Sequence, residues 1–327
     1  MIKKIKKIIK NPRHIVIALN RRNMLRIIPD KPFLKLYYKS IYGVKLNLKK
    51  PRTFNEKMQW LKIYDRKPEY TLMVDKYEMK KIVSQKIGEN HVIPTLGIWD
   101  RFEDIDFSKL PNKFVLKCTH DSGGLVVCRD KNKLDIEKTK IKIKNSLKRN
   151  YYWTAREWPY KKVKPRIMAE EYIDCVSEDI NLSPNEISTD ELQKKVGLLD
   201  YKFLCCNGVV KGMFLDIGII GSGTGHADEY YRNVYNSNFE LLDFLESREN
   251  YPIKIKKPIL FEKMKKIAEK LSEGMKFLRV DLYEINGKIF VGEFTFYHGS
   301  GLSNYFKPID GDYILGNWID LGVEHEK

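Results

Sequence analysis

The stretch that decides the fold is Arg279-Val-Asp-Leu-Tyr-Glu-Ile-Asn-Gly-Lys-Ile-Phe-Val-Gly-Glu-Phe-Thr, residues 279–295. Its Asn286-Gly287 dipeptide favours a two-residue hairpin turn, which predicts two antiparallel strands. Asp281 falls on the first strand, and Glu293 and Thr295 fall on the second. Hard oxygen ligands from neighbouring strands are what Mg²⁺ bound to nucleotide phosphates requires. Because acidic residues beside a hairpin are usually a solvated face, this motif gains meaning only together with others.

The hairpin also carries a prediction about register. A strict two-residue turn would pair Asp281 with Gly292 and turn Glu293 to the opposite face of the sheet. If Asp281 and Glu293 bind one metal ion, the hairpin must contain an irregularity, such as a bulge, between residues 285 and 292.

A second candidate element lies upstream, in Phe114-Val-Leu-Lys-Cys and the Ser122-Gly123-Gly124 that follows it. Lys117 ends an apolar run, and a buried ammonium needs a partner, which is either a nucleotide phosphate or a carboxylate. The glycines allow backbone N–H groups to approach phosphate oxygens closely. Neither a Walker loop nor a dinucleotide-binding Gly-x-Gly-x-x-Gly pattern is present, and a Ser-Gly-Gly alone is an ordinary turn.

Composition narrows the class of protein. The 327 residues are 43% hydrophobic, which excludes a disordered chain and suits one large or two moderate domains. A net charge of +17 favours polyanionic partners, although lysine bias across the whole chain explains it equally well. The five cysteines form no Cys-x-x-Cys pair, so we expect buried free thiols and no zinc site.

The N-terminal residues give the expectation about location. Ile2, Ile5, Ile8 and Ile9 recur at helical spacing between lysines, which suits either contact with an anionic bilayer or packing on the domain. No apolar run reaches the roughly 18 residues of a membrane span. We therefore predict a cytoplasmic protein, with peripheral contact at the inner face of the membrane as the alternative to simple packing.

The pattern along the chain predicts an α+β fold with antiparallel hairpins. Residues 1–50 form helical pieces broken at prolines 12, 29 and 32, and a capping box from Thr53 to Glu56 opens the next helix. Further helices are expected over residues 70–87, 135–148 and 258–275, and residues 178–195 are expected to be an exposed polar insertion. Strands are expected at the apolar runs 114–118, 125–128, 167–173, 201–206 and 209–215.

The order of these motifs resembles the ATP-grasp superfamily. More closely, several separated segments resemble the TupA-like, teichuronopeptide-type ATP-grasp family over residues 50–316. These segments are Phe54-Asn-Glu-Lys-Met-Gln-Trp-Leu-Lys, Lys117-Cys-Thr-His-Asp-Ser-Gly-Gly, Arg156-Glu-Trp-Pro-Tyr, Ala169-Glu-Glu-Tyr and Gly292-Glu-Phe-Thr-Phe.

The resemblance implies an ATP-grasp fold in which two α+β lobes clamp ATP. With the basic helical segment expected at residues 1–50, the first lobe is expected at 51–168 and the second lobe, with the metal site, at 169–327. The residues that it implies for nucleotide binding are Lys76, Lys117, the loop Ser122, Gly123 and Gly124, the adenine hinge Glu170, Glu171 and Ile173, and Lys202.

The resemblance further implies Asp281, Glu293 and Thr295 as Mg²⁺ ligands, with Arg279 and Lys117 facing the transferred phosphoryl group. Arg232 follows a glycine-rich stretch at Gly221, Gly223 and Gly225. An arginine on such a loop suits the charge of a transferred phosphoryl group, and the alternative is an ordinary loop. Thr295 stands where many ATP-grasp enzymes have an asparagine, which puts the second metal ion in doubt. Asp121 beside the phosphates would be repulsive unless Mg²⁺ or Lys117 offsets its charge.

The function so implied is an ATP-dependent carboxylate–amine ligase acting through an acyl phosphate, in bacterial surface polysaccharide biosynthesis of the capsular or teichuronic type. Its substrates would be a uronic acid and an amine such as an amino acid, with ATP and Mg²⁺ as cofactors and no nucleic-acid partner. The alternatives are a glycosyltransferase or sugar kinase of the same pathway, or a non-catalytic module that binds nucleotides or anions.

Overall fold

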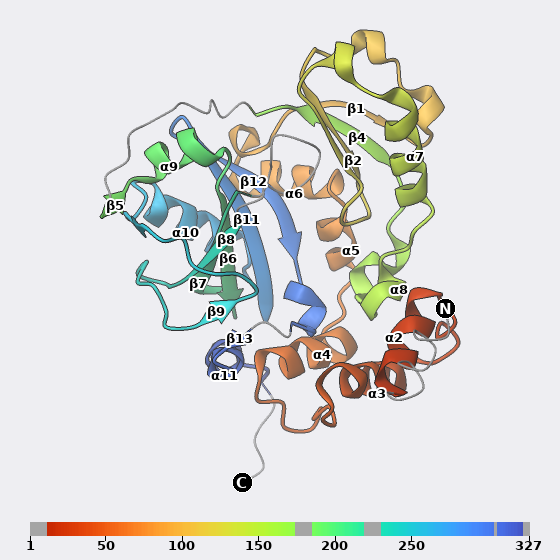
Figure 1. Ribbon diagram of the computed structural model, residues 1–327, viewed down its shortest axis with the longest axis vertical. Helices are drawn as coiled ribbons and strands as arrows, with labels where there is room; N and C mark the ends of the chain where they lie inside the picture. Colours follow the sequence, from red (N-terminus) through yellow and green to blue (C-terminus); the bar gives the residue numbers. More distant parts are fainter. Residues whose placement is uncertain (1–11, 174–184, 219–229, 304–305, 323–327) are drawn as a thin grey trace.

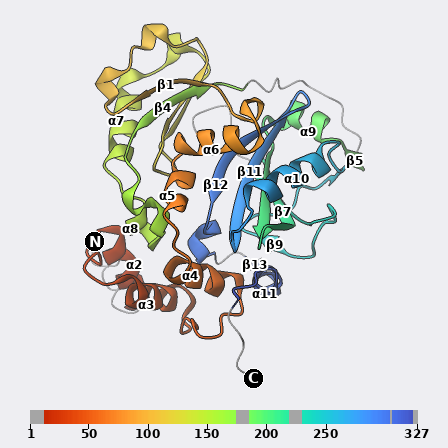
Figure 2. The same cartoon turned by 180° about the vertical axis from the view of Figure 1, so that it is seen from behind.

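The computed structural model describes residues 12–173, 185–218, 230–303 and 306–322. Two antiparallel sheets lie on either side of helices α5 (Glu69–Val74) and α6 (Glu78–Ile87), as both Figure 1 and Figure 2 show. Helices α2 (Pro12–Arg21), α3 (Asp30–Tyr42) and α4 (Phe54–Tyr64) lie together at one end of the molecule. The expected α+β architecture with antiparallel hairpins is therefore confirmed.

The larger sheet has five strands in the order β12-β11-β6-β7-β8, and every neighbouring pair is antiparallel. Its strands are β6 (Asp200–Cys206), β7 (Val209–Ile217), β8 (Tyr231–Asn236), β11 (Phe277–Ile285) and β12 (Lys288–Thr295). Helix α10 (Phe261–Leu271) packs against β6, β7 and β11 through an apolar face that includes Phe261, Met264 and Ala268. One face of this sheet is thereby covered, and the other is left to polar side chains.

The hairpin β11–β12 contains the irregularity that the sequence predicted. Asn286 and Gly287 both have positive φ, as a tight two-residue turn between strands requires. Leu282 pairs with Val291, but Asp281 pairs with Glu293, so Gly292 is an extra, unpaired residue. This bulge puts Asp281 and Glu293 directly opposite each other and therefore on one face of the sheet.

The smaller sheet has four antiparallel strands in the order β1-β4-β2-β3. These strands are β1 (Thr95–Trp99), β2 (Phe114–Cys118), β3 (Leu125–Cys128) and β4 (Ile167–Glu171). Alternation along β2 sends Phe114, Leu116 and Cys118 into an apolar cluster that also contains Ile143 of helix α7 (Ile136–Leu147). The same alternation turns Lys117 to the opposite face, where Glu170 of β4 also lies.

The remaining elements are short. They are helices α8 (Tyr152–Ala155), α9 (Thr189–Val196) and α11 (Asp310–Asn317), the strand pairs β5 (Glu186–Ile187) with β10 (Lys254–Ile255) and β9 (Leu245–Glu246) with β13 (Phe306–Lys307), and the 3₁₀ turns η5 (Trp158–Lys162) and η6 (His298–Gly301). None of the helices in the described part of the chain has both the length and the apolar character that a membrane span needs.

The capping box is confirmed at the start of α4, where Thr53 and Glu56 each bond the other's backbone. Three other expectations need correction. The helix expected over residues 70–87 is two helices, because the chain turns extended at Asp75. The end of the expected insertion, residues 189–195, belongs to α9 (Thr189–Val196), which has its own capping box with Ser188 as N-cap. Pro32 does not break α3 but lies in its first turn, where a missing backbone N–H costs nothing.

Parts of some expectations lie outside the described residues. These are the amphipathic N-terminus with Ile2, Ile5, Ile8 and Ile9, residues 178–184, and the glycine-rich stretch 221–225. Four cysteines lie within the described residues, and all four are buried and free as expected.

The bulge gives a test of stability. A Cβ at residue 292 would lie 2.7 Å from the Tyr283 ring, so Gly292→Ala should lower the free energy of unfolding by about 1–3 kcal/mol. Chemical denaturation measures this loss. The Tyr283→Ala background should remove most of the cost of Gly292→Ala, because the clashing ring is gone. Equal costs in both backgrounds would contradict this account of the bulge.

Candidate active site

Lys76 connects the two sheets. It lies between α5 and α6, and its ammonium donates to the Asp121 carbonyl, 2.9 Å away, at the start of the glycine-rich loop. The same Nζ lies 3.7 Å from a carboxylate oxygen of Glu293 on β12. Its backbone N–H also bonds the Thr119 carbonyl at 3.0 Å. The glycine-rich loop of one sheet and the acidic hairpin of the other therefore meet at this lysine.

Strand alternation gathers charged side chains on the face of the five-stranded sheet opposite α10. The register pairs Glu293 with Asp281 and Asp281 with Lys202, while Asp200 pairs with Asp216 and Asp216 with Arg232. Arg279 and Thr295, which pair two residues along the hairpin, point the same way. The sequence-predicted residues of this sheet therefore share one face.

Ion pairs connect these groups into one buried network. Arg279 donates to both oxygens of Asp281, at 2.6 and 2.7 Å, and to Glu293 at 3.1 Å. Lys202 donates to Asp281 at 2.8 Å and to Asp200, and lies 3.8 Å from Asp216. Because Asp281 is only 1% exposed, these cations are what allow it to be charged.

The network continues toward β8 and η6. Arg232 donates to both oxygens of Asp216 and to Glu246, and its guanidinium lies over the Phe214 ring. His298 of η6 contacts Arg279 at 2.8 Å and Glu246 at 3.3 Å. Arg232 is thus tied into the network that contains Arg279.

The charges set the pKa values of the network. Burial raises the pKa of Asp281, but Arg279 and Lys202 outweigh this effect and bring it to about 2. Burial also raises the pKa of Asp200, and Lys202 offsets this only partly while Asp281 and Asp216 raise it again, so it reaches about 7. Asp200 therefore carries the least well compensated charge of these carboxylates, and its Oδ1 has no hydrogen-bond partner in the described structure.

The glycine-rich loop, residues 119–125, is held from behind. The buried Asp121 carboxylate accepts hydrogen bonds from Ser146 and Arg149, and from the Ser122 backbone N–H at 2.8 Å. A Cβ at Gly124 would lie 2.1 Å from the Ser146 hydroxyl, so glycine allows this close approach. The charge of Asp121 is offset by Arg149, and Lys117 pairs with Glu170 instead. Ser122 and Gly123 stay exposed at the tip of the loop.

Lys117 and Glu170 form a second charged group on the four-stranded sheet. Glu170 accepts from Lys117 and, at 2.7 Å, from Lys80 of α6. Burial raises the pKa of Glu170, but the two lysines outweigh burial, so its pKa lies below the ordinary value. The partner of Lys117 here is thus a carboxylate, one of the two alternatives that the sequence left open.

The expected adenine hinge lies at the end of β4. The backbone N–H of Glu171 bonds the Pro94 carbonyl at 3.1 Å, and the Glu171 side chain is exposed. Ile173 is half-buried two residues further on. The Glu170 side chain, by contrast, is already engaged by Lys117 and Lys80.

Sequence reasoning missed several charged residues of this region: Lys80, Glu157, Asp200, Asp216, Glu246 and His298. Asp200 and Asp216 had a detectable signal, because each is an acidic residue at the end of a mostly apolar strand. Asp200 alternates with Lys202 along β6, and Asp216 pairs with Arg232 of β8. Lys80 had none, because a lysine on a helix is usually solvated.

Mg²⁺ is implied by the resemblance. The negative charge of the residues present suits this ion, but the arrangement of their side chains suits it less well. Within the described residues the network joins five carboxylates, Asp200, Asp216, Glu246, Asp281 and Glu293, to four cations, Lys76, Lys202, Arg232 and Arg279. The excess of negative charge and the unpartnered Asp200 oxygen suit an added cation. However, no group of three His, Cys, Asp or Glu in the described part of the chain is already arranged to hold a metal ion.

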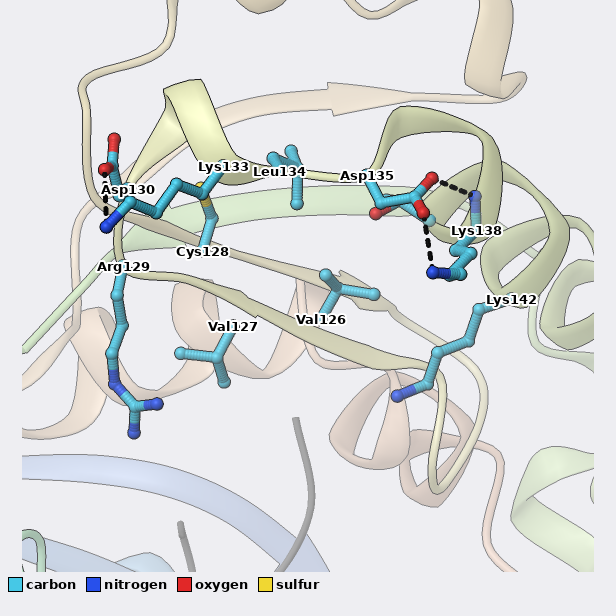
Figure 3. Close-up of a pocket in the computed structure, with 11 residues that line it drawn as sticks. Val126, Val127, Cys128, Arg129, Asp130, Lys133, Leu134, Asp135, Lys138 and Lys142 are labelled. Atoms are coloured by element: carbon cyan, nitrogen blue, oxygen red, sulfur yellow. Dashed lines mark hydrogen bonds and ion pairs between the residues drawn. The ribbon is translucent and has the colours of Figure 1, made fainter. Parts of the chain in front are cut away.

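A pocket of about 370 Å³ lies elsewhere, between β3 and α7 on the smaller sheet (Figure 3). Arg129, Lys133 and Lys142 are among its lining residues, and Asp130 and Asp135 pair with Lys133 and Lys138. None of the sequence-predicted site residues lines it.

Two antiparallel sheets that bring a glycine-rich loop and an acidic hairpin to one lysine define an enzyme of the ATP-grasp class. A family model described as TupA-like ATPgrasp matches residues 56–320. The chain therefore belongs to the TupA-like ATP-grasp family, as its motifs predicted. A comparison with curated proteins gives no match.

Solved structures with similarity to the chain include two ligases. D-alanine–D-alanine ligase from Bacillus anthracis, complexed with ATP, is 16% identical with a TM-score of 0.35, over 68% of this chain and 53% of that one. L-amino acid ligase from Bacillus licheniformis is 15% identical with a TM-score of 0.45, over 83% of this chain and 58% of that one. The chain thus spans little more than half the length of either protein, and the family match carries the assignment.

The pKa of Asp200 gives a pH-dependent prediction. Its pKa is raised on folding, so its contribution to stability is present at low pH and is lost as the pH rises from about 4 to about 7. Asp200→Asn removes this loss. The variant should gain roughly 1–3 kcal/mol relative to the wild type between pH 5 and pH 8, measured by chemical denaturation.

Asp310→Asn is the matched control, because Asp310 is exposed and lies outside the network. It should show the same difference from the wild type at both pH values. If the two variants respond to pH alike, Asp200 does not carry the uncompensated charge.

Proposed function

We propose that this protein is an ATP-dependent ligase that joins a carboxylate to an amine through an acyl phosphate. Membership of the ATP-grasp class supports the use of ATP. The carboxylate would attack the γ-phosphate, and the amine would then displace phosphate from the acyl phosphate. No covalent protein nucleophile is needed, so positioning and charge stabilisation supply most of the catalysis.

One observation carries this proposal. Lys76 contacts both the Asp121 carbonyl of the glycine-rich loop and the Glu293 carboxylate of the acidic hairpin. The loop that would cover the phosphates and the hairpin that would hold their metal ion lie far apart in the sequence, yet they share one lysine. A charged nucleotide tail placed there would meet cations from both sheets, which is the requirement for phosphoryl transfer.

The proposed roles follow the positions of the residues. Lys76 and Lys117 would bind phosphates, and the loop Ser122, Gly123 and Gly124 would cover them, through the backbone N–H groups of the two glycines because that of Ser122 bonds Asp121. Glu171 and Ile173 would meet the adenine, while Glu170 would hold Lys117 and Lys80 in place. The division into lobes at residues 50 and 168 stays a prediction.

Arg279 would face the transferred phosphoryl group, with Arg232 and Lys202 behind it in the same network. Asp281, Glu293 and Thr295 would hold Mg²⁺, which would neutralise phosphate charge during the transfer. Glu293 is the more accessible of the two acids: its side chain is 37% exposed, and that of Asp281 is 1% exposed.

We further propose that the acid is a saccharide carboxylate, such as a uronic acid, and that the amine is an amino acid, in the assembly of a bacterial surface polysaccharide. The TupA-like family membership and the net charge of +17 support an acidic saccharide. Cytoplasmic location, with peripheral contact through the N-terminus at an anionic membrane, belongs to the same proposal.

A metal-dependent glycosyltransferase of the same pathway has weaker support. Two Asp-x-Asp triplets occur, at residues 104–106 and 310–312. Neither belongs to the charged network around Asp281. Asp104 pairs with Arg101, and Asp106 caps the turn at Ser108. Asp312 accepts two hydrogen bonds from Asn55, so its carboxylate serves to hold α11 against α4.

Binding of Mg²⁺·ATP tests the proposal. The wild type should bind it, and Lys117→Met and Glu293→Gln should each weaken binding at least tenfold, about 1.4 kcal/mol, because each removes a group that faces the phosphates or their metal ion. Isothermal titration calorimetry measures the affinities. A screen of uronic acids with amino acids should then show ADP release that depends on both substrates.

The matched control is Lys288→Met, because Lys288 is an exposed lysine beside the hairpin turn and lies outside the charged network around Asp281. Its affinity for Mg²⁺·ATP should equal that of the wild type. A folded wild type that binds no Mg²⁺·ATP would refute the ligase, and ADP release with the acid alone would point to a kinase instead.

A further inference from the structure

Glu157 is a buried carboxylate whose charge no side chain neutralises directly. It lies between α8 and η5 and is 3% exposed. Its one hydrogen-bond partner among the described residues is the Ser300 hydroxyl, which donates to Oε1. No ion pair to a described lysine, arginine or histidine is formed. Burying a carboxylate in this way is costly, so an unpaired one needs an explanation.

Lys62, the lysine whose charge acts most strongly on Glu157, does not supply the missing partner. Lys62 of α4 is fully buried, and its ammonium donates to three neutral oxygens: Gln59 Oε1 at 3.1 Å, the Ala155 carbonyl at 2.8 Å and the Ser300 carbonyl at 2.7 Å. An ammonium has three N–H donors, so those of Lys62 are all used. Its charge still acts on Glu157 through space, but Lys62 is fixed elsewhere.

Ser300 links Glu157 to the charged network that contains Arg279. Ser300 belongs to η6, the turn that follows β12, and His298 of the same turn bonds Arg279 at 2.8 Å. Arg279 and Glu293 both lie close enough to shift the pKa of Glu157. The carboxylate is therefore linked, through Ser300 and the turn that also carries His298, to the arginine proposed to face the transferred phosphoryl group.

The backbone of η6 is strained at this point. Gly299, Ser300 and Gly301 all have φ near +57°, a left-handed conformation that a serine rarely adopts. Gln59 and Lys62 hold the turn by donating to the Ser300 carbonyl. Strain of this kind persists only where the surrounding structure enforces it, and it concentrates at functional sites.

Two tyrosines lie on the same stretch of chain as Glu157, Tyr151 just before α8 and Tyr160 in η5. Tyr151 and Tyr160 are half-buried, and their rings meet edge to face with centroids 5.0 Å apart. The charge of Glu157 is the main reason that the pKa of Tyr151 is raised, which places the two groups close together. Burial in turn raises the pKa of Glu157, because Lys62 and Ser300 offset only part of its desolvation. Aromatic faces beside a carboxylate suit a cation.

We infer that Glu157, which is held by Ser300 and lies on the stretch of chain that also carries Tyr151 and Tyr160, binds the ammonium group of the amine substrate. This inference rests on the proposed ligase function and names the residues for its second substrate. The incoming cation supplies the counter-ion that Glu157 lacks within the protein.

The chemistry of the step balances. The bound R–NH₃⁺ gives one proton to the Glu157 carboxylate and becomes a neutral amine. Its nitrogen attacks the carbonyl carbon of the acyl phosphate, so that a C–N bond forms and the C–O bond to phosphate breaks. The second proton of the nitrogen leaves with the phosphate, and Glu157 later returns its proton to solvent.

Glu157→Gln tests the inference, because it removes the charge and keeps an oxygen to accept from Ser300. The probe is glycinamide, an ammonium without a carboxylate, titrated by calorimetry into the protein loaded with Mg²⁺·ATP. The wild type should bind glycinamide but not neutral acetamide. Glu157→Gln should bind glycinamide at least tenfold more weakly, with unchanged affinity for Mg²⁺·ATP.

Thermal unfolding separates this role from a purely structural one. An unpaired buried carboxylate destabilises the free protein, so the melting temperature of Glu157→Gln should equal or exceed that of the wild type. A fall in its melting temperature would show that Glu157 holds the fold together and would overturn the inference. Glu262→Gln, at an exposed glutamate, is the control and should change neither glycinamide binding nor the melting temperature.

Turnover gives an independent readout once the acid is identified. Hydroxylamine is uncharged at neutral pH and captures an acyl phosphate without an ammonium site. Glu157→Gln should therefore form hydroxamate at the wild-type rate while its KM for the amine rises at least tenfold. Equal loss with both nucleophiles, or unchanged use of the amine, would overturn the inference.

The failure of this inference differs from the failure of the ligase itself. If the wild type binds Mg²⁺·ATP but not glycinamide, the amine site is wrong and the ligase stands. If the wild type does not bind Mg²⁺·ATP, the proposed function fails first, and the amine site fails with it.

Discussion

Buried charge is the constraint on which the rest of this structure depends. Asp281 can stay ionised away from water only because Arg279 and Lys202 donate to both of its oxygens. The register of β6 and β11 places these partners together, because Lys202 pairs with Asp281 and Arg279 lies two residues before Asp281 on the same face. The same need extends the network through Asp216 to Arg232 on β8. A sheet face charged in this way is already polarised before any ligand arrives, which suits a reaction that moves negative charge.

The two sheets solve different parts of one problem. The five-stranded sheet concentrates carboxylates and arginines on a single face, while the four-stranded sheet presents Lys117 and the glycine-rich loop. The loop can be open at its tip because Asp121 anchors its base through Ser146 and Arg149. Lys76, on the segment between α5 and α6, then ties the loop to Glu293. Because the side chain of Asp121 holds the base of the loop, the backbone N–H groups of the glycines at its tip can serve an anion.

Local sequence was a good guide wherever a short-range signal had a single physical meaning. Asn286-Gly287 fixed the hairpin, and the demand that Asp281 and Glu293 share a face predicted the bulge that Gly292 forms. It failed where a residue's partner lies far along the chain. At the break, the Asp75 carboxylate accepts from the backbone N–H groups of Tyr77 and Glu78, which is a local signal. It also accepts from Arg166, 91 residues away, and no helical pattern reports that contact. The partner of Asp121 was likewise misjudged, because Ser146 and Arg149 approach it from beyond the loop.

The sequence by itself determined the family, the strands and helices with clear periodicity, and the residue types that could serve ATP, because these depend on order and spacing along the chain. Tertiary structure decided which of those residues meet. It assigned Glu170 to two lysines, joined Arg232 to the Arg279 network, and left Glu157 buried beside Ser300 without a counter-ion. The physical reason is that the free energy of a charge depends on its burial and its neighbours in space, and neither can be read from its position in the chain.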